Sequence, residues 1–287
     1  KRAELFGGRE KDKGGARMMR ADSHVHSRNS SDGRDRIADI VREAEEKGLC
    51  YLAITDHLDL ELKYGGGHTP VRWRHIDLDA YYAEWSEAKR EAEARGSKVD
   101  LRLGIEAGYG ENVCDRYLET LSRYPFDVVI NSVHFVGGWD VYFPNAFLFK
   151  RKRTVYGEYL DNILKSLDAP YHYDIVAHIG YVTRNAPYID KSLVFADFPD
   201  KFERILKGII DRGKCLEVNT HTTLFPSVEL LEKYYSYGGR RISFGSDSHH
   251  AELCKDYEQT ARLLKDIGFT EFTVFEGGGK ERKIPIE

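Results

Sequence analysis

The chain has 287 residues, of which 41% are hydrophobic and 31% charged, and its formal net charge is −4. This balance fits one barrel-sized domain, or two ordinary ones, with a sizeable buried core. The mildly acidic charge gives no basic field for gathering nucleic acid, and no apolar run approaches the roughly 20 residues of a membrane helix. We therefore expect neither nucleic acid nor a membrane as a partner.

Residues 1–18 are charged and glycine-rich and lack the apolar core of a secretory signal. We interpret them as a disordered leader or tag-like tail, and residues 19–287 as a single domain. The four cysteines are widely spaced and never form a CxxC pair, which predicts buried thiols in a reducing compartment. A cytoplasmic location follows by default. The sequence does not predict an oligomeric state.

Apolar β-prone runs alternate with helical periodicities along the rest of the chain. Strands are predicted at 19–25, 49–54, 99–105, 126–133, 173–179, 214–218 and 241–244, with a last one at 271–275. Helices are predicted at 36–47, 78–95, 114–123, 155–167, 198–212, 228–235 and 251–267. Seven or eight such units without a clear linker predict an α/β fold with an all-parallel barrel. The two longest interruptions, 59–76 and 137–153, follow strands that end in histidine and should overhang the barrel mouth.

Histidines and carboxylates end these strands one after another. His24 and His26 are two residues apart, so both rings can point to one face of a strand and hold one ion. Asp247 and His249 repeat this spacing on a strand that neighbours the first one if the barrel closes. Such convergence predicts a metal site with more than one ion.

Other candidate ligands have competing interpretations. His57 is assigned as a ligand, and Asp56 as a support that orients His57 through its other ring nitrogen. Glu106 is favoured as a carboxylate bridging two cations, because a buried strand end would hardly accept it unpaired. An ion pair between Glu106 and Arg102 is the alternative.

Three further residues are less distinctive on their own. His134 and His178 end strands in mid-chain, where a single hydrogen-bonded core histidine is the commoner outcome, and only the series with the other motifs favours ligation. Asp32 is as consistent with capping the helix near Arg36, or with shaping a turn, as with binding a metal.

The motifs together resemble the PHP (polymerase and histidinol phosphatase) superfamily. The resemblance covers about residues 21–249, with the motifs in the right order, and is strongest to monofunctional histidinol-phosphate phosphatases. The segment 124–140 is the most typical of them. The resemblance to the superfamily rests on these motifs: His24-Val-His26-Ser, Ser31-Asp32-Gly33, Thr55-Asp56-His57, Gly104-Ile-Glu106, Ser132-Val-His134-Phe, Ala177-His178-Ile-Gly and Gly245-Ser-Asp247-Ser-His249.

The resemblance implies a distorted (β/α)7 TIM-like barrel with a trinuclear site. It also implies that Asp32 is a ligand, since the family places His or Asp there. The implied sets are His24, His26, Glu106 and Asp247 for one ion; Asp32, His57 and His249 for a second; and Glu106, His134 and His178 for a third. Mixed nitrogen and oxygen ligands suit three divalent transition-metal ions, namely Zn, Mn or Fe.

The implied activity is hydrolysis of L-histidinol phosphate to L-histidinol and phosphate in histidine biosynthesis. We expect a metal-bridging hydroxide to attack phosphorus, because bound water loses its proton near pH 7. Arg184, six residues past His178, is the candidate phosphate clamp, and a surface arginine is the equal alternative. The leaving alkoxide could take its proton from Asp247 or from a histidine such as His249.

Substrate contacts are predicted at the barrel mouth. Tyr109, Glu111 and Trp139 would suit an amine and an imidazole. His221 stands where the family leads us to expect a smaller residue. It is one of two histidines outside the ligand sets, with His68, that could reach substrate.

Three other functions compete with this one. The nearest is another PHP reaction, on a nucleotide, an oligonucleotide 3′ end or phosphotyrosine. An amidohydrolase also begins with HxH, but none of the ligand-bearing strand ends offers the lysine that many of those enzymes carbamylate. A non-catalytic PHP scaffold usually lacks several ligands, whereas this chain has all nine.

Overall fold

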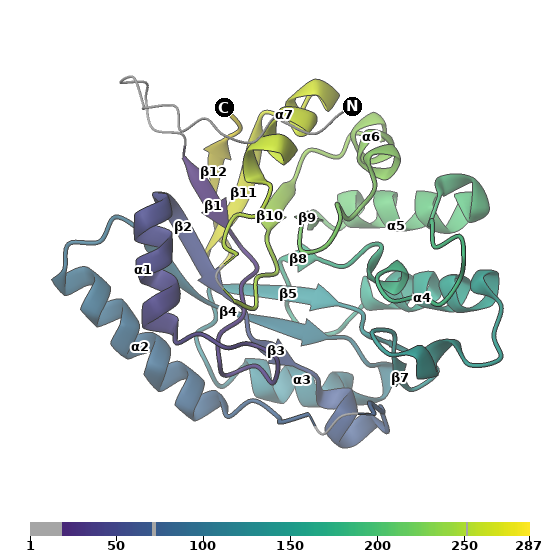
Figure 1. Cartoon of the computed structure of the whole chain (residues 1–287), viewed down its shortest axis with the longest axis horizontal. Helices are drawn as coiled ribbons and strands as arrows, with labels where there is room; N and C mark the ends of the chain where they lie inside the picture. The colour runs from purple at the N-terminus through teal and green to yellow at the C-terminus, as the bar shows by residue number, and fades with distance from the viewer. Residues whose placement is uncertain (1–18, 71–72, 251) are drawn as a thin grey trace, which may run out of the picture.

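The computed structural model describes residues 19–70, 73–250 and 252–287. The segment interpreted as a leader therefore lies outside the described residues. Seven parallel strands follow one another around a barrel in the order β1-β2-β4-β5-β8-β9-β10 (Figure 1). Their bounds are β1 Arg20–Asp22, β2 Leu49–Ile54, β4 Asp100–Gly108, β5 Val128–Ser132, β8 Ile175–Val176, β9 Cys215–Asn219 and β10 Ile242–Gly245. This arrangement confirms the predicted parallel barrel.

The barrel closes between its first and last strands. Ser23 N donates to Phe244 O at 2.9 Å, and Asp247 N donates to His24 O at 2.8 Å. A parallel bridge also joins Val25 to Ser248. These bonds lie beyond the end of β1, so the predicted strand at 19–25 is interrupted after residue 22, while its following residues still contact β10.

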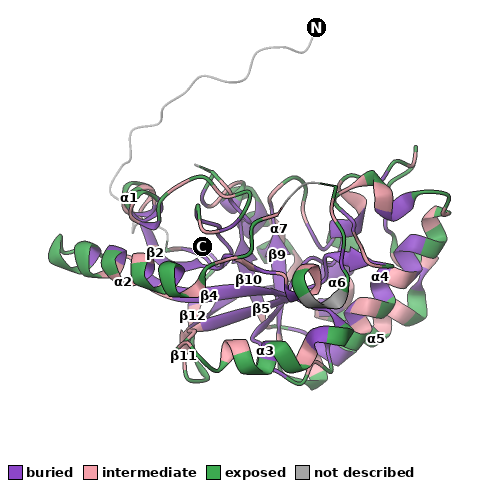
Figure 2. Cartoon of the chain, turned by 90° about the horizontal axis from the view of Figure 1, so that it is seen from below, coloured by how far each residue is buried: buried purple, intermediate pink, exposed green. Residues whose placement is uncertain are grey.

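Helices surround the barrel, and their outer faces are exposed while the strands are buried (Figure 2). In α1, the buried residues Ile37, Ile40, Val41 and Ala44 recur at helical spacing and form one apolar face. The helices are α1 Ile37–Lys47, α2 Leu78–Ala94, α3 Cys114–Leu121, α4 Lys152–Ser166, α5 Pro199–Asp211, α6 Val228–Ser236 and α7 Tyr257–Ile267. No helix in the described ranges is long and apolar enough to span a bilayer.

Helix α7 begins six residues later than predicted. Cys254 and Asp256 adopt left-handed backbone conformations with φ of 53° and 55°, which an α-helix does not contain. Cys254 N instead donates to Asp22 Oδ2 at 2.9 Å, tying this turn to β1. A contact across the sequence thus overrides the helical periodicity.

The last predicted strand lies outside the barrel sheet. β11 (Glu271–Gly277) pairs antiparallel with β12 (Lys280–Pro285), a strand that the sequence did not predict. β11 packs against β5 and β10, and Arg102 Nη1 donates to Glu276 O at 2.9 Å. The hairpin therefore covers the amino end of the barrel and leaves the carboxyl end to the loops.

Short elements lie in the loops at the carboxyl end. β3 (His57–Leu58) follows β2 and pairs with β4, while β6 (Phe135–Val136) and β7 (Trp139–Asp140) form a small hairpin. The remaining loop elements are single helical turns: η1 Glu61–Gly65, η2 Glu111–Val113, η3 Pro144–Phe147, η4 Tyr181–Thr183 and η5 Phe195–Asp197. The loops that carry these elements frame the mouth of the barrel.

Candidate metal centre

Glu106, at the carboxyl end of β4, is fully buried and faces five imidazoles. Its Oε1 lies 2.5 Å from His178 Nε2 and 3.1 Å from His134 Nε2. Its Oε2 lies 2.6 Å from His57 Nδ1, 3.5 Å from His24 Nε2 and 3.7 Å from His26 Nε2. The two oxygens of one carboxylate therefore address two different groups of histidines.

Asp247 and Asp32 complete the cluster on the other side. Asp247 Oδ1 lies 3.1 Å from His26 Nε2 and 3.7 Å from His24 Nε2. Asp32 Oδ2 lies 3.3 Å from His249 Nε2 and 3.6 Å from His57 Nε2. All nine predicted ligand side chains thus come together at the carboxyl end of the barrel.

Two of these residues have unusual backbones. His178 and Asp247 adopt left-handed conformations with φ of 61° and 52°. Such φ values are uncommon outside glycine, although Asp and His tolerate them better than most residues. Each residue lies two positions past the end of its strand, where the turn brings its side chain into the cluster, and strain of this kind concentrates at functional sites.

Opposite charges stabilise one another across the cluster. Burial alone would raise the pKa of Glu106, but the surrounding imidazoles, above all His57 and His134, outweigh it and hold that pKa well below its ordinary value. Burial would lower the pKa of His134, yet Asp59 and Glu106 raise it to about 10. The carboxylates therefore stay ionised, so each can serve as an anionic metal ligand.

The donor set fits metal ions better than a closed hydrogen-bond network. His24 Nε2, His57 Nδ1 and Glu106 Oε2 are buried and have no hydrogen-bond partner among the described residues. The sets His24, His26 and Glu106, and Glu106, His134 and His178, each offer ligand atoms within 4.8 Å of one another. Bound cations would satisfy these unpartnered atoms, and imidazole with carboxylate suits transition metals.

Two carboxylates outside the ligand sets, Asp59 and Asp56, have definite roles in the structure. Asp59 Oδ1 lies 2.8 Å from His134 Nδ1 and so fixes that ring. Asp56 does not orient His57 as expected: its oxygens accept hydrogen bonds from Ser27 N at 2.7 Å and Ser30 Oγ at 2.5 Å. Asp56 therefore stabilises the turn that follows the first histidine pair. Sequence separations of 26–75 residues gave no local signal for these pairs.

A cavity of about 440 Å³ opens above the cluster. Arg184 and His221 both line it, as predicted, and Arg184 Nη2 donates to Asp247 Oδ2 at 3.0 Å. His221 Nδ1 lies 2.5 Å from Asp247 O. The cavity also has an aromatic and acidic part that the sequence did not predict, made of Trp73, Asp140, Tyr142, Phe143 and Tyr181.

The other predicted substrate contacts do not line this cavity. Glu111 is exposed and pairs with Lys165 at 2.6 Å, on the outside of the barrel. The ring of Tyr109 is buried in the core, and Trp139 packs against His68, with 5.3 Å between ring centroids. Arg102 pairs with Asp100 at 2.8 Å instead of with Glu106. Ion pairs, core packing or ring contacts outside the cavity thus hold these side chains.

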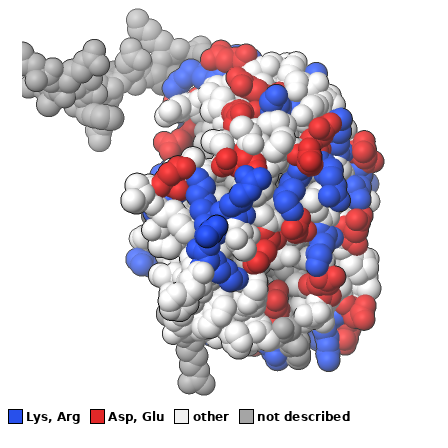
Figure 3. Space-filling model, turned by 90° about the vertical axis from the view of Figure 1, so that its right-hand side faces the viewer, with Lys and Arg blue, Asp and Glu red and all other residues white. Residues whose placement is uncertain are grey.

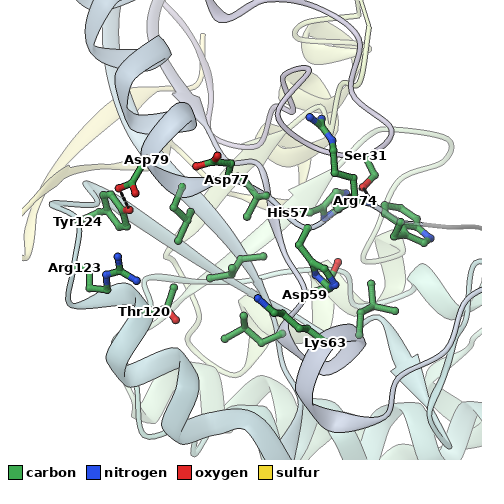
Figure 4. A pocket seen from close by; sticks show the side chains of 17 residues that line it. Ser31, His57, Asp59, Lys63, Arg74, Asp77, Asp79, Thr120, Arg123 and Tyr124 are labelled. Carbon is green, nitrogen blue, oxygen red and sulfur yellow. Dashed lines mark hydrogen bonds between the residues drawn. The ribbon is translucent and has the colours of Figure 1, made fainter.

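A second hollow of about 270 Å³ lies beside the cluster (Figure 4). His57 and Asp59 line both hollows. Its other polar residues are Ser31 and residues of the 59–79 segment and of the 120–124 segment at the end of α3. The figure shows two hydrogen-bonded pairs there, Ser31 with Arg74 and Asp79 with Tyr124. These side chains already have partners, so this hollow is secondary to the cavity above the cluster.

The fold and the cluster define a class: a parallel α/β barrel that gathers metal-binding histidines and carboxylates at the carboxyl ends of its strands. The family model described as PHP domain matches residues 22–221. The chain belongs to the PHP domain family, which confirms the resemblance found in the sequence.

Individual relatives agree with this assignment. A probable histidinol-phosphatase from Clostridium acetobutylicum is 30% identical over 80% of this chain and 87% of that protein. The histidinol-phosphatase of Lactococcus lactis is 30% identical over 91% of this chain and 96% of that protein. A solved structure of histidinol phosphate phosphatase from Lactococcus lactis, complexed with zinc, L-histidinol and phosphate, superposes with a TM-score of 0.80 at 28% identity and covers 93% of this chain and 100% of that chain.

Proposed function

We propose that this protein is a metal-dependent phosphatase that hydrolyses L-histidinol phosphate to L-histidinol and phosphate. The observation that carries the proposal is the position of Glu106, whose two oxygens address separate groups of imidazoles. Three of these imidazoles, His57, His134 and His178, line a substrate-sized cavity. The relatives named histidinol-phosphatase support the choice of substrate.

We assign the nine ligands to three divalent ions. One ion would be held by His24, His26, Glu106 and Asp247, a second by Asp32, His57 and His249, and a third by Glu106, His134 and His178. The zinc in the related Lactococcus structure supports zinc as one choice. When bound, such ions lower the pKa of water toward 7 and neutralise phosphoryl oxygens.

The chain's own residues bind and orient the substrate. Arg184 is nearly buried but lines the cavity, so its guanidinium is placed to donate to a phosphate oxygen. The ring of Tyr181 lies 4.7 Å from its guanidinium carbon and fixes the side chain. Asp247 and a histidine such as His249 are the two candidates for protonating the leaving alkoxide.

The far part of the cavity suits a cationic, aromatic leaving group. Burial raises the pKa of Asp140 to about 6, and this carboxylate accepts a hydrogen bond from Tyr142 N at 2.8 Å. An ammonium or imidazolium group next to Asp140 would stabilise the ionised carboxylate. Tyr142 and Phe143 supply apolar and aromatic surface beside it.

The surface favours a small substrate over an oligonucleotide. On the face that carries α4 and α5, Lys and Arg side chains form one contiguous group and are elsewhere interspersed with Asp and Glu (Figure 3). Several are paired, including Lys152 with Asp190 at 2.6 Å and Arg212 with Asp168 at 2.5 Å. Paired cations add little to the electrostatic affinity for a phosphate backbone. The expected cytoplasmic location stays a prediction.

Turnover of three substrates by the metal-loaded protein tests the proposal. We expect histidinol phosphate to be hydrolysed faster than a phosphotyrosine peptide or an oligonucleotide, and faster turnover of either competitor would reject the assignment. His57→Ala should abolish turnover. His250→Ala is the matched control, because that exposed histidine pairs with Asp35 at 2.8 Å outside the cluster and its loss should leave activity unchanged.

A further inference from the structure

β9 differs from the other six barrel strands because none of the nine proposed ligands lies on it or directly after it. It carries Glu217 instead, which is only 2% exposed. A carboxylate buried to this degree needs compensating partners. The identity of those partners indicates what this strand contributes to the site.

Glu217 contacts two of the proposed ligand residues. Its Oε1 forms a short hydrogen bond with His24 Nδ1, and its Oε2 accepts one from the backbone N–H of His178 at 3.1 Å. His24 follows β1, and His178 follows β8. One carboxylate therefore connects a ligand of the first proposed ion with a ligand of the third.

The contact to His24 requires the side chain to cross a neighbouring strand. β10 lies between β9 and the start of the barrel, and Gly245 is the residue at the crossing point. A Cβ atom on Gly245 would lie 2.7 Å from His24 Cβ and 2.8 Å from Glu217 Oε1. Only glycine leaves enough room for the carboxylate and the imidazole to meet.

The hydrogen bond also sets the tautomer of His24. An ionised carboxylate only accepts hydrogen bonds, so Nδ1 carries a proton and the Nε2 lone pair is the one that a metal ion would take. Nε2 is the atom that lies 3.5 Å from Glu106 Oε2 and 3.7 Å from Asp247 Oδ1, with no hydrogen-bond partner among the described residues. The lone pair thus points into the proposed first ion site.

We propose that Glu217 is a positioning residue of the metal centre, which fixes the ring and tautomer of His24 and holds the backbone of His178 in place. The inference rests on the proposed metal-dependent function. It gives Glu217, a residue of β9 outside the ligand motifs, a role in metal affinity. Outer partners of this kind typically change metal affinity by about 10- to 100-fold.

The test measures Zn²⁺ affinity by competition with a chelator, without any substrate. Glu217→Gln should weaken the tightest Zn²⁺ binding by about 10- to 100-fold. The amide has only one acceptor oxygen, so its NH₂ group would face either His24 Nδ1 or the backbone N–H of His178, and both of these are donors. The matched control is Asp174→Asn. Asp174 is a buried carboxylate at the other end of the barrel, where it accepts from Val129 N at 2.9 Å.

A purely structural role is separated by thermal unfolding with and without Zn²⁺. If Glu217 only stabilises the fold, each variant will lower the unfolding midpoint by the same amount with and without Zn²⁺. Both variants will then keep the wild-type Zn²⁺ affinity, and that result would overturn the inference. If it positions ligands, Glu217→Gln alone should reduce the midpoint shift that Zn²⁺ causes. Failure of the wild type to bind Zn²⁺ would instead reject the proposed function.

A second variant and a wild-type measurement cover the case in which Glu217→Gln does not fold. Gly245→Ala keeps every ligand and Glu217 but separates Glu217 from His24, so it should weaken Zn²⁺ binding in the same way. In wild-type protein with ¹⁵N-labelled histidine and bound Zn²⁺, the His24 ring should carry its proton on Nδ1. A proton on Nε2 would overturn the proposal.

Discussion

The charged side chains at the two ends of the barrel have different kinds of partner. At the amino end, Asp174 accepts from Val129 N at 2.9 Å and Asp127 accepts from Leu103 N at 3.0 Å. Arg102 and Arg282 both pair with Asp100, at 2.8 Å each. At the carboxyl end, carboxylates face imidazoles, and three ring nitrogens there have no hydrogen-bond partner among the described residues: His24 Nε2, His57 Nδ1 and His178 Nδ1.

This difference separates charges that maintain the fold from charges that serve the site. Backbone N–H groups and guanidinium groups satisfy the amino-end carboxylates without any added ion, and the β11–β12 hairpin covers that end. Burying the carboxylates of the cluster would cost free energy unless protonated imidazoles or metal ions compensated their negative charge. Perturbing the carboxyl end should therefore change activity and metal binding, whereas perturbing the amino end should change stability alone.

Complete removal of metal ions should have the largest effect. Dialysis against a chelator is expected to abolish phosphatase activity, and adding Zn²⁺ or Mn²⁺ should restore it. At a free metal concentration of 100 times the dissociation constant, binding adds about 2.7 kcal/mol of stability. For a domain near this size, that corresponds to a rise of roughly 5–10 °C in the unfolding midpoint. Full activity of protein shown to be metal-free by elemental analysis would mean that the charges at the carboxyl end do not serve a metal site.

Glu106→Gln should have the next largest effect. The amide lacks the negative charge with which Glu106 would bind the first and the third proposed ion. We therefore expect kcat to fall by more than about 100-fold, beyond the range typical of residues that only support a metal ligand. Steady-state rates and metal content measure this. Circular dichroism should show that the barrel remains folded. A variant that keeps full metal content and near-normal kcat would remove Glu106 from the site.

Arg184→Ala should produce an intermediate effect. A hydrogen bond from a charged donor contributes about 1.5–3 kcal/mol, so inhibition by inorganic phosphate should weaken roughly 10- to 100-fold. Arg28→Ala is the control, because Arg28 pairs with Glu84 on the surface at 3.2 Å. Equal inhibition constants for Arg184→Ala and the wild type would show that the guanidinium does not contact phosphate.

Glu111→Gln should have the smallest effect. The sequence suggested a substrate contact at this position, but the side chain is exposed and pairs with Lys165 outside the cavity. We expect kcat and KM for histidinol phosphate to change by less than about twofold, and stability by less than about 0.5 kcal/mol. A marked rise in KM would mean that the exposed loop closes over the substrate.

Local patterns predicted most of the fold. The helix at 78–95 ends within one residue of the prediction, and its first turn is capped by the Asp77 side chain, which accepts from Ala80 N at 3.1 Å. The strand at 49–54 matches β2 at both ends. The late start of α7 and the separate β11–β12 hairpin were missed because long-range contacts decide them.

By itself, the sequence pattern determined the parallel barrel and eight of the nine candidate ligands, since apolar runs with polar ends are local features and the carboxyl ends of parallel strands meet at one edge. The ninth, Asp32, was assigned through the family resemblance. Only the tertiary structure decided which carboxylates support those ligands. Glu217 and His24 are 193 residues apart, and Asp59 and His134 are 75 residues apart. Such pairs form across strands whose relative heights and side-chain directions depend on how the whole barrel packs.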